Sequence, residues 1–163
     1  MRKILLCLFT CLIGFTGNSN AQESSVPANL QAAVFKKIFL FNKTLQEKGN
    51  IAIAVLSKDD AGDEITEAFK SAGLNAVTVK EGQIPSSSTV VYIMPGVASP
   101  KQYCAEHGIL SISGTGSYIE DGKAAVGLII EEGKAKIIVN ITELKAEKQE
   151  LSSQVLSFAK VIQ

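Results

Sequence analysis

The hydrophobic positions of the chain alternate between helical and extended spacing. The first periodic segment, residues 28–46, carries an apolar stripe at intervals near 3.6 residues, which is typical of a core-facing helix. The members of this stripe are Leu30, Val34, Ile38, Phe41 and Leu45. A second strip, made of Ala32, Phe35 and Phe39, lies about 100 to 140° away around the same helix. This strip indicates either a wider buried face or a partner-binding surface with Phe35 and Phe39 as exposed anchors, because interfaces favour aromatic side chains.

Short apolar runs rich in Val and Ile follow, and they predict buried strands. These runs are residues 51–56, 76–79, 90–94 and 109–112. Helices are expected between them, one reaching residue 72 with Ser57 or Asp59 as its N-cap and Gly73 as its stop, and one from residue 99 or 100 to 106. Strands that alternate with helices in this way predict a parallel α/β sheet.

The end of the chain departs from this alternation. Residues 125–131 and 135–141 are two strand-like runs joined by Glu132, Gly133 and Lys134, which predicts an antiparallel hairpin with glycine at the position of positive φ. Two helices, residues 142–147 and 151–162, are expected to close the chain. The predicted fold class is therefore α/β: a single domain with a mostly parallel sheet flanked by helices, a C-terminal antiparallel hairpin and a closing helix.

The first 21 residues carry the features of a secretory signal peptide. Arg2 and Lys3 are followed by an apolar run of about 12 residues, and Ser19 and Ala21 place small residues before a cleavage site. Such a run is too short to cross a bilayer about 30 Å thick as a helix. We therefore expect cleavage after Ala21, export out of the cytoplasm, a short leader over residues 22–27, and one domain over residues 28–163.

Removing the signal changes both the charge and the cysteine content. The full chain has 16 basic and 16 acidic residues, and the signal removes two of the basic ones, so the mature net charge is about −2. This charge gives no indication of a nucleic-acid surface. Cys7 and Cys11 leave with the signal, so the remaining Cys104 cannot form an internal disulfide, and a buried position is expected for it.

Few residue patterns suggest chemistry. Asp59 and Asp60 resemble the acidic pair of phosphorylated receiver domains, but the third predicted strand ends without a carboxylate. Cys104 and His107 lie three residues apart, yet no third catalytic group is identifiable, so His107 is expected to complement the end of a helix. No metal site can be assembled from one His and one Cys.

The loop after the fourth predicted strand is the only glycine-rich candidate for ligand binding. Backbone N–H groups of Gly114, Thr115, Gly116 and Ser117 could cradle an anion, because open α/β sheets bind ligands at the carboxyl ends of their strands. A tight turn is the simpler interpretation, because a later glycine or a P-loop lysine is missing.

Four stretches of the chain resemble the YfiR-like family, also called the YfiR/HmsC-like group. LQAAVFKKIFLFN at residues 30–42 resembles its opening helix, and GILSIS at residues 108–113 resembles its fourth strand. GLIIEEGKAKIIVN at residues 127–140 and LSSQVLSFAKVI at residues 151–162 resemble its terminal hairpin and helix. Asn140 and the pair Ser152 and Ser153, at this spacing, are the most specific part of the match.

The resemblance implies a periplasmic regulatory binding protein that is not an enzyme and needs no cofactor. In the family, such a protein controls an inner-membrane sensor protein such as a diguanylate cyclase, and so controls cyclic di-GMP; a sensor kinase is another partner of this kind, and a homodimer is a further assembly to consider. The alternative is a periplasmic small-ligand-binding protein or hydrolase that uses Gly114 to Ser117.

Overall fold

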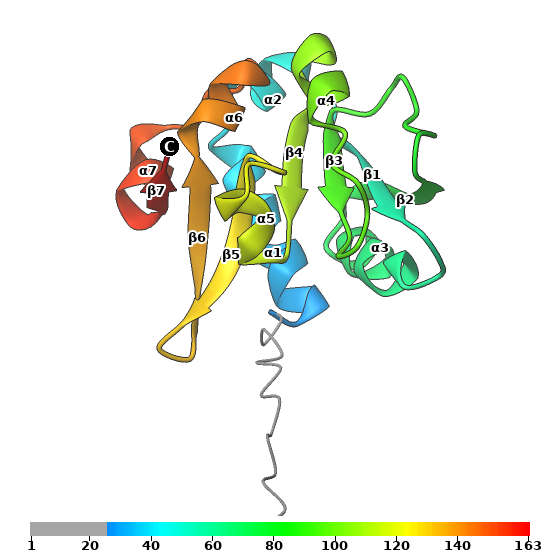
Figure 1. Ribbon diagram of the computed structural model, residues 1–163, viewed down its shortest axis with the longest axis horizontal. Helices are drawn as coiled ribbons and strands as arrows, with labels where there is room; N and C mark the ends of the chain where they lie inside the picture. Colours follow the sequence, from blue (N-terminus) through cyan, green and yellow to red (C-terminus); the bar gives the residue numbers. More distant parts are fainter. Residues whose placement is uncertain (1–25) are drawn as a thin grey trace, which may run out of the picture.

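Apolar runs of the sequence form one seven-stranded sheet in the computed structural model, which describes residues 26–163 (Figure 1). The strands are β1 (Ala52–Ser57), β2 (Asn75–Lys80), β3 (Val90–Ile93), β4 (Leu110–Ser113), β5 (Val126–Glu131), β6 (Lys134–Asn140) and β7 (Lys160–Ile162). The predicted signal peptide, residues 1–21, and residues 22–25 of the leader lie outside the described residues.

The sheet is mostly parallel and contains an antiparallel hairpin, as the sequence predicts. Its strand order is β2-β1-β3-β4-β5-β6-β7, and the first five strands in this order are parallel. β6 runs antiparallel to β5, and β7 runs parallel to β6. β1, β3 and β4 are buried along their whole length because helices cover both faces, which explains why they are continuous apolar runs without alternation.

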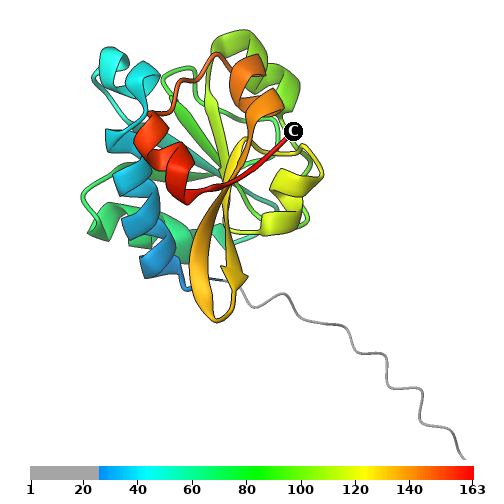
Figure 2. The ribbon, with the colours of Figure 1, turned by 90° about the vertical axis from the view of Figure 1, so that its left-hand side faces the viewer.

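In the described part of the chain, seven helices lie between and around the strands. They are α1 (Ala28–Leu40), α2 (Lys43–Lys48), α3 (Gly62–Ser71), α4 (Lys101–His107), α5 (Gly116–Glu120), α6 (Ile141–Ala146) and α7 (Ser153–Phe158). Side chains of α1, α3 and α7 pack on one face of the sheet, and those of α4 and α5 pack on the other. Figure 2 shows α1, α7 and the β5–β6 hairpin together on the side that faces the viewer.

The first predicted helix is broken into two, so the expectation of one helix over residues 28–46 is wrong. Asn42 ends the continuity because its Oδ1 accepts a hydrogen bond from the Leu45 N–H at 3.0 Å, which makes it the N-cap of α2. Its Nδ2 donates to Oε1 of Gln149, 3.1 Å away. A contact with a residue far along the chain thus fixes the end of α1.

The start of α3 also differs from the prediction. α3 begins at Gly62, with Ala61 at the N-cap and no side-chain cap. Ser57 is instead the buried last residue of β1, and Asp59 accepts a hydrogen bond from the Ala61 N–H in the preceding turn. A Cβ on Gly62 would lie 2.8 Å from that of Ser57, so glycine is needed where helix and strand meet. Gly73 has a φ of 79° just after the helix, which confirms the predicted stop.

The chain end contains an element that the sequence pattern misassigns. The predicted helix over residues 151–162 holds only as α7, because Ala159 is extended and the next three residues form β7 beside β6. The short helix α5 after β4 was not expected either. Between β5 and β6, Glu132 and Gly133 have φ of 53° and 74°, which confirms the predicted hairpin turn.

Candidate functional site

Phe35 and Phe39 are fully buried, so the expectation that they form exposed anchors is wrong. The two rings stack with their centroids 6.3 Å apart, and the Phe35 ring meets the edge of Tyr92 on β3 at 6.2 Å. Phe69 of α3 contacts the same group, with its centroid 6.3 Å from that of Phe35. The second apolar strip is buried because α1 is held between α3 and the sheet, and so it belongs to the core.

The other apolar stripe, which runs from α1 into α2, is only partly buried. Ile38 and Leu45 are core residues, but Leu30 and Phe41 are 45% and 40% exposed. On the opposite flank of α1, Lys36 donates a hydrogen bond to the Ala72 carbonyl at the end of α3. The flank that carries Leu30 and Phe41 therefore points away from α3, toward the hairpin and α7. The backbone N–H of Ser152, the N-cap of α7, donates to the Phe41 carbonyl at 2.9 Å.

Six of the seven exposed large apolar side chains in residues 26–163 lie on the α1 and α7 side of the sheet. These six, which we call the apolar face, are Leu30, Leu40, Phe41, Ile130, Phe158 and Val161. Ile130 belongs to this side because every second residue of a strand points to the same face, and Val126 and Leu128 of β5 point into the core under α1 and α7. Phe158 is 77% exposed at the end of α7.

Val77 is the seventh exposed apolar side chain, and it lies apart from the apolar face. Its neighbour Ala76 points into the core under α1 and α3, so Val77 points to the other face of the sheet, on the edge strand β2. Its exposure, 48%, is close to that of Leu30 and Val161. Val77 therefore serves as a matched control for the apolar face.

The glycine-rich loop after β4 is shaped by close packing. A Cβ on Gly114 would lie 2.1 Å from Oε1 of Gln31 and 2.5 Å from the Tyr92 hydroxyl. The hydroxyl donates to Gln31 Oε1 at 2.7 Å and accepts from the Gly114 N–H. Burial raises the pKa of Tyr92 to about 12, so the phenol stays protonated. Gly114 thus joins the start of α1 to β3.

The next residues of the loop are also engaged within the fold. The Thr115 N–H donates to Ser113 Oγ at 3.3 Å, and a Cβ on Gly116 would lie 2.1 Å from Cγ2 of Ile129. Ser117 is half-buried within α5. The N–H groups of Gly114 and Thr115, which the sequence offered as an anion cradle, are therefore already bonded to the protein.

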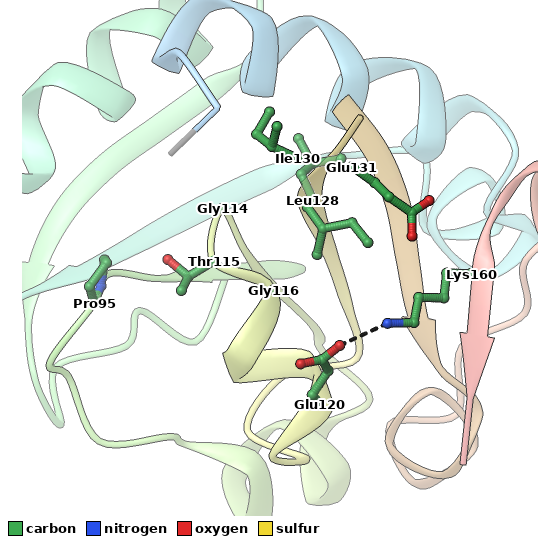
Figure 3. A pocket seen from close by; sticks show the side chains of 10 residues that line it. Pro95, Gly114, Thr115, Gly116, Glu120, Leu128, Ile130, Glu131 and Lys160 are labelled. Carbon is green, nitrogen blue, oxygen red and sulfur yellow. Dashed lines mark hydrogen bonds and ion pairs between the residues drawn. The ribbon is translucent and has the colours of Figure 1, made fainter. Parts of the chain in front are cut away.

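A cleft of about 470 Å³ lies between this loop and the far half of β5 (Figure 3). Glu120 of α5 and Lys160 of β7 also line it and form an ion pair of 2.9 Å. The hydrogen bond that Lys160 donates to the Glu120 carboxylate holds the pKa of Lys160 above its usual value. Lys136 contacts Glu131 in a second ion pair and lowers the pKa of that carboxyl.

Cys104 and His107 do not form a catalytic pair. Cys104 is fully buried, as predicted, and burial followed by the nearby Glu147 carboxylate raises the pKa of the thiol to about 12. His107 is exposed; its ring stacks on Tyr103 with centroids 4.1 Å apart, and its Nδ1 lies 2.9 Å from the Tyr103 carbonyl oxygen. A protonated, enclosed thiol cannot act as a nucleophile.

Glu147 is a buried carboxyl group that the sequence pattern does not reveal. It is 1% exposed; its Oε2 accepts from the Ser111 N–H at 2.9 Å, and its Oε1 accepts from the Ser111 hydroxyl. Burial raises the pKa of Glu147 to about 7, although the two hydrogen bonds from Ser111 oppose this. Glu147 therefore lies beside Ser111 of β4, one residue before Ile112, where the pairing of β4 with β5 begins.

Asn140 and Ser152, two residues of the family resemblance, are the N-cap residues of α6 and α7. Asn140 caps α6, since its Oδ1 accepts from the N–H groups of Thr142 and Glu143 at 3.0 and 3.1 Å. Its Nδ2 donates to the Ile119 carbonyl at the end of α5.

Within residues 26–163 no group of three or more His, Cys, Asp or Glu side chains could hold a metal ion, and no helix there is long and apolar enough to cross a membrane.

Comparisons with known proteins agree with this fold. A solved structure described as the ABC domain in complex with L-Trp from Streptococcus pneumonia is similar, with a TM-score of 0.58 and 13% identity. The match covers 83% of this chain and 60% of that one, so this chain spans under two thirds of that protein. A search of curated proteins finds no significant match. A family model described as YfiR/HmsC-like matches residues 28–160. The chain therefore belongs to the YfiR/HmsC-like family.

Proposed function

We propose that this protein is a periplasmic regulatory binding protein that controls an inner-membrane signalling protein, with a diguanylate cyclase as the first candidate and a sensor kinase as the second. Membership of the YfiR/HmsC-like family supports this proposal. The signal-peptide features of residues 1–21 support export to the compartment where such a partner exposes its sensor region.

The apolar face is the observation that carries the proposal. Six large apolar side chains from α1, β5, α7 and β7 and their flanks are exposed on one side of the sheet. Exposed apolar side chains gathered on one side of a protein are typical of a partner-binding surface. Phe41 and Phe158 are the strongest anchors, because large aromatic side chains contribute most to binding when a partner buries them.

Deleting the gene in its host tests the proposal. If the protein restrains a diguanylate cyclase, the deletion raises cellular cyclic di-GMP several-fold, and the wild-type gene restores the original level. Unchanged cyclic di-GMP in the deletion strain would remove the cyclase from consideration. Phosphorylation of the candidate sensor kinase, measured in the same strain, then tests the second partner class.

Variants of the apolar face locate the contact. We expect a gene that carries both Phe41→Ser and Phe158→Ser to produce a normal amount of protein. This gene should not return cyclic di-GMP in the deletion strain to its original level. Val77→Ser, at a similarly exposed apolar position on the other face of the sheet, should restore it fully. Equal activity of the double variant and the Val77 control would show that the partner binds elsewhere.

A further inference from the structure

The far half of β5 has an edge that no other strand covers. β4 pairs with β5 only at Ile112 with Val126 and at Ser113 with Gly127, and the chain then turns away at Gly114. Among the described residues, 128–131 of β5 pair only with β6. The sheet therefore has an open strand edge in its interior, next to the cleft that Gly114, Thr115 and Gly116 border.

The pairing of the hairpin shows which backbone groups face this edge. The Asn140 N–H donates to the Ala125 carbonyl at 2.8 Å, which makes Val126 and Val139 a pair without mutual hydrogen bonds. Bonded and non-bonded pairs alternate along an antiparallel ladder, so Leu128 and Ile130 also direct their backbone groups away from β6. The two-residue turn closed by Glu131 and Lys134 requires the same alternation.

Ile130 is the centre of this open edge. Its N–H and C=O point toward the cleft, and no hydrogen bond to either group is present within residues 26–163. The side chain is 37% exposed on the apolar face. Closer to β4, the Leu128 carbonyl oxygen lies beside Gly116, 3.8 Å from where a Cβ on that glycine would be. Backbone donors and acceptors in a row are the groups that an added strand recognises.

The lining of the cleft indicates the chemistry of its occupant. Its charged side chains are neutralised, Glu120 by Lys160 and Glu131 by Lys136, so the cleft offers no unpaired charge for an ionic ligand. The rest of the β5 wall is apolar, with Leu128, Ile129 and Ile130. Neither proline nor a charged residue stands at these three positions, although such residues commonly protect open strand edges.

We propose that this edge binds an extended, uncharged segment of a protein partner, which adds as a strand beside Leu128 to Glu131 and places an apolar side chain next to Ile130. The four-residue edge is about 13 Å long, at 3.3 Å per residue. The identification of the protein that supplies this strand as the signalling partner rests on the proposed function. The proposal deepens that function by naming main-chain hydrogen bonding as the means of recognition.

A phage-displayed library of short random peptides, panned against the naturally processed protein, tests the proposal. We expect selected peptides to be poor in charge, and to slow hydrogen exchange of the Ile130 amide about tenfold or more in NMR spectra. Peptides that bind without protecting this amide, or a library that yields no binder, would overturn the inference.

Two variants separate main-chain from side-chain recognition. Ile130→Pro removes the N–H at a position where the ladder to β6 does not use it, and should weaken peptide binding about tenfold or more. Ile130→Ala keeps this N–H and should weaken binding less. Thr115→Trp fills the cleft without altering β5, and should abolish binding even if the proline variant fails to fold. Undiminished binding to Thr115→Trp would contradict the proposal.

The outcomes distinguish this inference from the proposed function. The response of cyclic di-GMP to gene deletion does not depend on how the partner is recognised. A normal response combined with failure of the peptide experiment would therefore overturn only strand addition at β5. Peptide binding at Ile130 without any response to deletion would instead leave the edge as a binding site and remove the regulatory assignment.

Discussion

At the scale of single residues, burial separates side chains that look equivalent in the sequence. Phe35 and Phe41 are both aromatic positions in the segment for which the sequence predicts one helix, but Phe35 is fully buried and Phe41 is 40% exposed. The difference arises because α1 lies in a corner between α3 and the sheet: the strip of Phe35 and Phe39 enters that corner completely, whereas the stripe that carries Phe41 is only partly buried. The free energy of unfolding should report this difference directly.

We predict that Phe35→Ala lowers the free energy of unfolding by about 3 to 5 kcal/mol, because it removes a ring that packs on Phe39, Phe69 and Tyr92. Phe41→Ala should cost about 1 kcal/mol or less, as its ring remains partly in water. Urea unfolding of both purified variants measures the two values. Similar losses for the two variants would contradict the burial of α1 described above.

A second prediction concerns Glu147, whose pKa in the folded protein is about 7 instead of 4.5. The folded state holds the proton more tightly than the unfolded state, so the stabilisation is full below about pH 4.5 and is lost as the pH rises through 7. The loss amounts to about 3 kcal/mol. Glu147→Gln should remove most of this fall in stability between pH 5 and pH 8.

Thermal unfolding at several pH values measures this effect. Glu150→Gln is a suitable control, because Glu150 is an exposed carboxyl group that pairs with Lys43. This control should keep the pH dependence of the wild type. A Glu147→Gln variant with the wild-type pH profile would show that Glu147 is not the group responsible.

At the scale of elements, contacts between distant segments decide where helices end. The hydrogen bond from Asn42 to Gln149 joins residues 107 positions apart and holds the α1–α2 junction against the segment before α7. Leu151 pairs with Asn42 in an isolated bridge at the same place. The α1–α2 junction and the segment before α7 are therefore held together, which positions the apolar side chains of α1 and α7 on one side of the sheet.

We predict that Asn42→Ala lowers the free energy of unfolding by about 1 to 3 kcal/mol. The substitution removes the cap of α2, worth about 1 kcal/mol, and leaves the buried Gln149 without this donor. Asn29→Ala, an exposed change within α1, should be nearly neutral in the same denaturation measurement. A neutral Asn42→Ala would mean that the junction is held by other contacts.

At the scale of the whole molecule, two surfaces adjoin at Ile130. Its side chain belongs to the apolar face, and its backbone belongs to the open edge of β5. A partner that supplies one strand to this edge would therefore place its next side chains beside α1. The sheet order makes this arrangement possible, because β4 is short and the hairpin extends beyond it.

We predict that the mature protein begins at Gln22. We expect intact-mass measurement of protein from its native host to give a chain that lacks residues 1–21, because Ser19 and Ala21 fit the cleavage site of a signal peptidase. Fractionation should recover it from the periplasm. A mass that retains residues 1–21 would contradict the proposed export route.

The sequence by itself determined the α/β class, most of the strands and the hairpin, because these depend on local features. The spacing of apolar side chains sets the type of element, and residues such as Gly73 and Gly133 mark turns through their own backbone freedom. The resemblance to the YfiR-like family likewise rested on residues close together in the chain, and the family match over residues 28–160 confirms it.

Only the tertiary structure decided which strip of α1 is buried, where α1 ends, that the last residues form β7, and that β5 has an open edge. Each of these features depends on segments far apart in the sequence, such as α1 against α3 or β7 against β6. Glu147 shows the same limit, since its burial depends on Ser111, 36 residues earlier. Local periodicity cannot encode such contacts, because it shows that a side chain is apolar and leaves open which neighbour will cover it.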